Sequence, residues 1–175
     1  MQQSALATAR PERGPCFSSR FRRRLHAYRA ALSLEWSDST VHPDFSSRPD
    51  LPASAGQCGV TSAWLLQELP WILRQRARYC FGDIVVQGKT LEFHCWIEIG
   101  RASAPGRWIL DVTCDQFELL ADHAFVCDRH SSLVARSIEY RASSRQSARQ
   151  LRSDPVWDRV QVLTARMSRW FASDS

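Results

Sequence analysis

The sequence is poor in lysine and in long apolar runs. Lys89 is its single lysine, so the net charge of +5 at pH 7 rests on arginine. The apolar runs are well short of the roughly 20 residues that a transmembrane helix needs, which argues against a membrane span. Residues 1–24 contain arginines but lack the apolar segment of a secretory signal. We therefore expect a cytoplasmic protein that does not enter a membrane.

No nucleic-acid-binding motif accompanies the arginines. They gather between Arg20 and Arg29 and again between Arg136 and Arg169. A basic surface of this kind can bind nucleic acid or an acidic partner, but solvated helix faces have the same composition. Because no aromatic residues alternate with the arginines, we favour solvated faces and do not expect a nucleic-acid partner. A non-catalytic protein that binds an acidic partner through its basic surface is the alternative to an enzyme.

Six cysteines without a secretory signal indicate reduced thiols rather than a disulfide framework. Cys80, Cys95 and Cys114 lie in apolar runs, where a thiol packs as a small hydrophobic side chain. Cys58 differs, because the flanking Gly56 and Gly59 are typical of a tight turn. Cys58 is therefore the candidate reactive thiol.

The composition is that of one globular domain. The chain has 175 residues, of which 44% are hydrophobic and 23% are charged. Residues 1–17 lack periodicity and are expected to be a mobile tail, which leaves 18–175 as the domain. We place the core of this domain at about residues 30–120 and a helical C-terminal extension at 144–173.

Residue spacing predicts an α+β fold in which a helix packs on a small antiparallel sheet, with further helices at both ends. Apolar residues at helical spacing predict helices over 20–35, over 58–69 and from 154 onward, with Ser18 or Ser19 as the cap of the first. A Ser- and Pro-rich loop joins the first two. Alternating patterns then predict strands, and the segment 117–134 is ambiguous. The three predicted strands span 79–86, 90–99 and 107–112.

Three residues in these elements suggest a nucleophile, its base and a group that orients the base: Cys58, His94 and Asp111. The N-terminal end of a helix favours the thiolate form of Cys58. Alternation along the second strand places His94, Trp96 and Glu98 on one face. His94 and Asp111 are 17 residues apart, a separation that two adjacent antiparallel strands can bring side by side.

Three further side chains are candidates for shaping this site. The amide of Gln57 and the backbone N–H of Cys58 are candidate donors to an oxyanion. Trp96 is expected to wall the site and exclude water. Gln116 is expected to hydrogen-bond the loop before Cys58.

The chain resembles the YunG-like family of uncharacterised bacterial proteins, within the transglutaminase-like and papain-like superfamily of cysteine enzymes. The resemblance spans roughly residues 30–120. It rests on Trp36-Ser37 with Thr40, Gly56-Gln57-Cys58-Gly59-Val60-Thr61, His94-Cys95-Trp96, and Leu110-Asp111-Val112-Thr113 with Gln116-Phe117. The departures are Cys95 and Ile97-Glu98 after the histidine, and the Arg- and Ser-rich C-terminal extension. The resemblance implies a fold and a triad of Cys58, His94 and Asp111, but no established reaction.

From these residues we expect a cysteine-dependent amidase, peptidase, deamidase or acyl-transferase that needs no cofactor. Its substrate would be a peptide, protein or small amide. A zinc site is the weaker alternative: His123, Cys127 and His130 have the spacing of one helix face, with Cys114 as a fourth candidate ligand. The paired ligand knuckles of structural zinc sites are missing.

Overall fold

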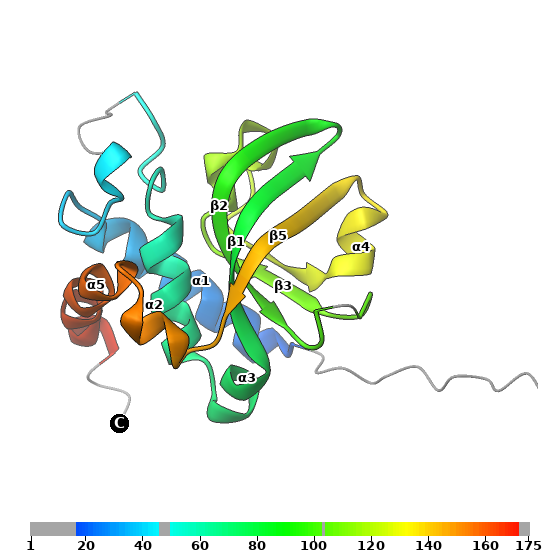
Figure 1. The fold of residues 1–175 in the computed structure, drawn as a ribbon. Coiled ribbons are helices and arrows are strands. Elements are labelled where there is room, and N and C mark those ends of the chain that lie inside the picture. The colour runs from blue at the N-terminus through cyan, green and yellow to red at the C-terminus, as the bar shows by residue number, and fades with distance from the viewer. Residues whose placement is uncertain (1–16, 46–49, 103, 172–175) are drawn as a thin grey trace, which may run out of the picture.

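The computed structural model describes residues 17–45, 50–102 and 104–171. Its fold is α+β, as the sequence predicts: a five-stranded antiparallel sheet flanked by helices (Figure 1). The strand order is β4-β3-β2-β1-β5. The strands are β1 (Ala77–Val86), β2 (Lys89–Ile99), β3 (Trp108–Asp111), β4 (Val126–Arg129) and β5 (Ile138–Gln146).

The described chain has three long α-helices and two short ones. The α-helices are α1 (Ser19–Glu35), α2 (Cys58–Glu68), α3 (Trp71–Arg76), α4 (His130–Val134) and α5 (Val156–Phe171). Short 3-10 turns lie between them. In the described chain these are η1 (Pro43–Phe45), η2 (Cys114–Gln116), η3 (Glu118–Leu120) and η4 (Gln150–Ser153).

The two predicted long helices before the sheet are confirmed. Helix α1 starts where the Ser18 side chain accepts a hydrogen bond from the backbone N–H of Phe21 at 3.3 Å, as an N-cap does. Helix α2 starts at Cys58 and ends before Pro70. Nearly all of α2 is buried because it lies between α5 and the sheet (Figure 1).

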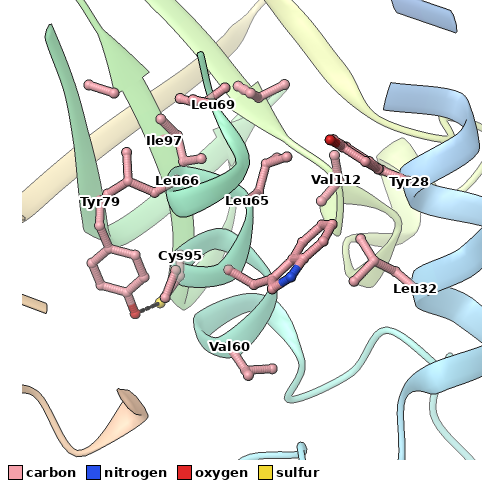
Figure 2. Close-up of a cluster of buried hydrophobic side chains, with 14 of the residues drawn as sticks. Tyr28, Leu32, Val60, Leu65, Leu66, Leu69, Tyr79, Cys95, Ile97 and Val112 are labelled. Atoms are coloured by element: carbon pink, nitrogen blue, oxygen red, sulfur yellow. Dashed lines mark hydrogen bonds between the residues drawn. The ribbon is translucent and has the colours of Figure 1, made fainter. Parts of the chain in front are cut away.

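The two faces of β2 enter different parts of the core. Cys95, Ile97 and Ile99 pack against α1, α2 and α5, in the cluster that Figure 2 draws. Trp96 lies in a second cluster on the opposite face of the sheet, which η2, η3 and α4 cover. The predicted alternation along this strand is therefore confirmed.

Three regions differ from the sequence predictions. Residues 138–146 form β5, which pairs with β1. The extension expected to be helical, 144–173, therefore begins within a strand. The ambiguous segment contains η3, β4 and α4. Phe17, expected in the mobile tail, is buried and lies 4.7 Å from Trp108 between ring centroids, whereas residues 1–16 are outside the described chain.

Within the described residues, no helix combines the length and the apolar character needed to traverse a bilayer.

Candidate active site

Cys58 is the first residue of α2 and lies at the edge of the core. Its side chain is buried, with 9% of the residue exposed. The preceding Gln57 gives the helix no side-chain cap, so N–H groups of the first turn remain free to bind an anion. The turn into the helix depends on Gly56, whose φ of +70° suits glycine and whose missing Cβ would lie 2.5 Å from Cβ of Phe45.

A distortion of β2 directs His94 toward this helix end. The register between β1 and β2 shifts between Gly82 and Ile84, and Phe93 has a φ of +61°, a conformation that a bulky residue seldom adopts. His94 Nε2 lies 2.8 Å from Asp111 Oδ2 on the neighbouring strand β3. The other ring nitrogen, Nδ1, is buried and forms no hydrogen bond of standard geometry among the described residues. One ring nitrogen of His94 is thus held by Asp111, and the other is left without such a bond.

Asp111 is fully buried and is held by donors on every side. Its Oδ1 accepts hydrogen bonds from Thr113, from the backbone N–H at 2.9 Å and from the hydroxyl at 3.1 Å. Its Oδ2 accepts from Tyr140 Oη at 3.0 Å in addition to the His94 contact. Tyr140 was not among the predicted site residues, because it belongs to β5, which the sequence analysis did not predict.

The pKa values describe a charged pair at neutral pH. Burial on its own would lower the pKa of His94, but the charge and hydrogen bond of Asp111, together with Cys58, raise it to about 10. Burial works against ionisation of Asp111, and the adjacent His94 and the donors Thr113 and Tyr140 still hold its pKa below the usual value.

The pKa of the Cys58 thiol is held well below its ordinary value. A hydrogen bond from the Cys95 thiol is the largest cause, burial opposes it, and the hydrogen bonding and charge of His94 add to it. The Cys58–His94 interaction acts on the pKa although Nδ1 forms no hydrogen bond of standard geometry. The attraction between the Cys58 thiolate and the His94 imidazolium therefore contributes to the lowered pKa of Cys58.

Cys95 belongs to the site, although the sequence analysis interpreted it as core packing. Its Sγ accepts a hydrogen bond from Tyr79 Oη at 3.0 Å, the contact drawn as a dashed line in Figure 2. Interaction with Cys58 raises the pKa of Cys95 well above its ordinary value, so this thiol stays protonated and can donate to Cys58. The signal available in the sequence was a cysteine directly after the histidine.

A cleft of about 800 Å³ opens beside these residues. Cys58, His94, Cys95 and Gln116 are among the residues that line it. Apolar and aromatic side chains form much of the rest: Phe45, Leu51, Phe81, Leu91, Phe93 and Val156. The buried nucleophile candidate therefore lies beside space that a ligand can enter.

The three predicted site-shaping residues have different outcomes. Gln116 Nε2 donates to the carbonyl oxygen of Ser54 at 2.5 Å, so its predicted bond to the loop before Cys58 is confirmed. Gln57 Nε2 donates to the carbonyl oxygen of Ser37 at 3.4 Å, and the residue lines a neighbouring hollow rather than the cleft. Trp96 is fully buried behind His94, with the rings 13° from parallel and their centroids 6.5 Å apart. It supports the imidazole and does not line the cleft.

Residues of the upstream motif tie the loop to α2. Trp36 Nε1 donates to Thr61 Oγ1 at 2.9 Å, and Thr40 Oγ1 bonds both the N–H and the carbonyl of Ser37. Ser37 in turn accepts from Gln57. The sequence resemblance therefore picks out residues that position the segment leading to Cys58.

The alternative metal ligands do not converge. The helix that would place His123, Cys127 and His130 on one face is not formed, because Cys127 lies in β4. Cys114 and Cys127 belong to the two different core clusters. Among the residues that the structure describes, no three His, Cys, Asp or Glu side chains are grouped so as to hold a metal ion.

Comparison with known proteins found no matching family model, no matching curated protein and no matching solved structure.

Proposed function

We propose that this protein is a cysteine-dependent enzyme that processes amides or related acyl compounds through an acyl-enzyme. The observation that carries the proposal is the state of His94. Its Nε2 is fixed by a buried carboxylate. Its Nδ1 forms no hydrogen bond of standard geometry within the described part of the chain, at a helix end that bears a thiol of lowered pKa. This division of roles is that of a nucleophile, a base and an orienting group.

In the first half-reaction, the Cys58 thiolate attacks the carbonyl carbon of the substrate and forms a C–S bond. The electron pair of the carbonyl moves to oxygen and then returns as the C–N bond breaks. His94, as imidazolium, protonates the leaving amine, and a thioester on Cys58 remains. Asp111 stays ionised throughout and holds the imidazole in one orientation.

The tetrahedral intermediate needs donors for its oxyanion. The N–H groups of the first turn of α2, beginning with Cys58 itself, are suited to this role because the side chain of Gln57 does not cap them. The amide of Gln57 is turned to Ser37 and is not needed for the proposal.

The second half-reaction uses an acyl acceptor. Water is the default acceptor: His94 removes its proton, the oxygen attacks the thioester, and Cys58 leaves as thiolate. Amidase, peptidase and deamidase chemistry all share this step, and an amine in place of water would give acyl transfer. The resemblance to transglutaminase-like and papain-like enzymes supports the same class of chemistry.

A reporter ester tests the proposal without knowledge of the natural substrate. With 4-nitrophenyl acetate we expect a burst of nitrophenolate and an acetyl group on Cys58, located by mass spectrometry of the intact protein and its peptides. Cys58→Ala should lose both. Cys127→Ala is the matched control, because Cys127 is also a buried thiol but lies in β4, and it should retain both.

Turnover separates chemistry from simple thiol reactivity. In wild type the acetyl group should be released by hydrolysis, and in His94→Gln it should stay on Cys58. Equal acetylation of several cysteines, or acetylation of Cys58 that His94→Gln does not alter, would contradict the proposal.

A second candidate function has one observation in its favour. Arg74, Arg78, Arg149 and Arg152 line a separate hollow with the exposed Trp71, and none forms an ion pair among the described residues. This surface fits a non-catalytic protein that binds an acidic partner. Salt-sensitive retention on a polyanionic resin that Arg149→Gln with Arg152→Gln abolishes, together with no acylation of Cys58, would favour it over the enzyme.

A further inference from the structure

The cleft beside Cys58 contains an arginine that forms no ion pair with any residue that the structure describes. Arg159 lines this cleft from α5. It lies one turn after Val156, whose Cγ2 is 3.6 Å from the position a Cβ would take on Gly59. The start of α5 is thus packed against the first turn of α2, so Arg159 approaches the same space as the Cys58 thiol.

The charge of Arg159 is not compensated by the described residues. Its Nη1 is buried without a hydrogen-bond partner, and its guanidinium forms no ion pair there. Other arginines of the described chain with buried ends are paired: Arg29 lies 2.6 Å from Asp115 and Arg107 lies 3.2 Å from Glu98. A partly buried cation without an anion is costly.

The acidic residues that line the cleft do not supply that anion. Asp154 Oδ2 accepts from Gln146 Nε2 at 3.0 Å, and its Oδ1 accepts from the backbone N–H of Val156 at 2.9 Å. Asp44 lies 3.5 Å from His42 Nδ1. Glu92 is exposed and shares no ion pair with Arg159. Gln146 adds an acceptor, because its Oε1 is buried and has no donor among the described residues.

The remainder of the wall is apolar and accessible. Phe81 and Phe93 stack with their centroids 6.1 Å apart, and they are 36% and 71% exposed. Phe45 lines the cleft and is 43% exposed. Exposed aromatic rings around a cleft favour an apolar group of a ligand.

We propose that Arg159 binds a carboxylate of the substrate, so that Cys58 acts on acyl compounds that carry both an apolar group and a carboxylate. A guanidinium pairs with a carboxylate through two parallel N–H···O bonds, which also orients the ligand. An N–H of the ligand can meet Gln146 Oε1. This inference rests on the proposed function, because only an enzyme has a substrate. The binding of a carboxylate next to Cys58 can still be tested by itself.

Two alkylating probes that differ in one charge test the inference. They are N-iodoacetyl-phenylalanine, a free acid, and its neutral counterpart N-iodoacetyl-phenylalaninamide. In wild type, Cys58 should react faster with the acid by about tenfold, the effect expected of one charge-assisted pair. Arg159→Gln should bring the ratio of the two rates close to one. Arg159→Lys should retain part of the preference, because it keeps the charge but not the fork.

The control is Arg152→Gln, which removes the same charge outside the cleft and should leave the ratio as in wild type. Arg159→Met, which keeps an apolar stem, repeats the test should the glutamine variant not fold. A rate ratio that Arg159→Gln and Arg159→Met leave unchanged would overturn the inference.

The two proposals fail separately. Acetylation of Cys58 with turnover, but no charge preference, would leave the enzyme without this subsite. A charge preference that depends on Arg159, but no turnover of any ester or amide, would leave a carboxylate-binding site without the proposed catalysis.

Discussion

Strand β2 carries two buried charged side chains on one face, and the two differ in how completely their partners surround them. His94 and Glu98 are 1% and 2% exposed, and both face partners of opposite charge. Trp96 lies between them on the same face and separates the two sites. Because strand, face and burial are the same, the difference in their partners is informative.

Glu98 is surrounded by cations on both carboxylate oxygens. Arg145 Nε lies 2.9 Å from Oε2, Arg145 Nη2 lies 3.3 Å from Oε1, and Arg107 Nε lies 3.2 Å from Oε1. Glu98, Arg107 and Arg145 are not among the residues that line the cleft. The arrangement compensates the charge fully, as expected of a structural ion cluster.

His94 is compensated at one atom alone. Its Nε2 contacts Asp111, which Thr113 and Tyr140 hold in turn. Its Nδ1 forms no hydrogen bond of standard geometry with the residues that the structure describes, and His94 lines the cleft. A buried imidazole with one nitrogen that lacks a hydrogen bond lowers the stability of the fold, and a reacting partner that binds this nitrogen can offset the loss. An incomplete set of partners, rather than burial or charge, therefore distinguishes the reactive end of β2 from the structural end.

The largest effect is expected from His94→Gln. Loss of the imidazolium should raise the pKa of Cys58 toward its ordinary value, so that alkylation by iodoacetamide near pH 6 slows by about 100-fold. The rate is measured by mass spectrometry on the Cys58 peptide. Glu98→Gln, the matched change at the structural end, should leave this rate unchanged in the folded protein. Equal slowing by both variants would contradict the assignment of His94 to the reactive end of β2 and of Glu98 to the structural end.

Glu98→Ala should have the largest effect on folding. It leaves Arg107 and Arg145 without an anion, and we expect the free energy of unfolding to fall by about 3 kcal/mol. Urea unfolding followed by tryptophan fluorescence measures this change. A loss within error of zero would show that the Glu98 cluster is not structural in the sense argued above.

Cys95→Ala tests how much the Cys95 thiol contributes to the lowered pKa of Cys58 at the reactive end of β2. Its thiol is the largest cause of the lowered pKa of Cys58, so its removal should raise that pKa and slow alkylation near pH 6 by about tenfold. Cys95→Ser, which restores a donor, should recover part of the rate. Cys80→Ala is the control from the opposite face of the sheet, and it should leave the rate unchanged.

Tyr140→Phe is expected to have the smallest effect. It deletes one of the hydrogen bonds to Asp111 and should cost about 1 kcal/mol of unfolding free energy. Because His94 and Thr113 still hold the carboxylate, alkylation of Cys58 should slow by less than in Cys95→Ala. A loss of reactivity as large as that of His94→Gln would assign Tyr140 a direct role instead.

Much of the fold near the site could be predicted from local signals. The Ser18 cap and the apolar spacing after it located α1, and the glycines around Cys58 located the start of α2. Alternation separated the faces of β2 correctly. These signals are local, since each depends on the spacing of neighbouring residues.

The missed parts depend on contacts between distant residues. Strand β5 is polar over most of its length and is stabilised by pairing with β1, so its sequence carries little alternation. The approach of Cys95 to Cys58 depends on how α2 packs across β2, and the turn of His94 depends on the unusual φ of Phe93. Apart from the position of Cys95 directly after His94, no pattern of neighbouring residues indicates either.

The most direct test of the central claim is an ultraviolet titration of the Cys58 thiolate, with Cys58→Ser as the blank. The lowered pKa of Cys58 and the raised pKa of His94 mean that the thiolate is present at neutral pH and is lost as the pH falls through the lowered value. We predict thiolate absorbance that depends on Cys58 at about pH 7, where an ordinary thiol with a pKa of about 8.5 is almost fully protonated. In His94→Gln this absorbance should first develop near the ordinary pKa. A Cys58 that titrates near that value in wild type would contradict the account.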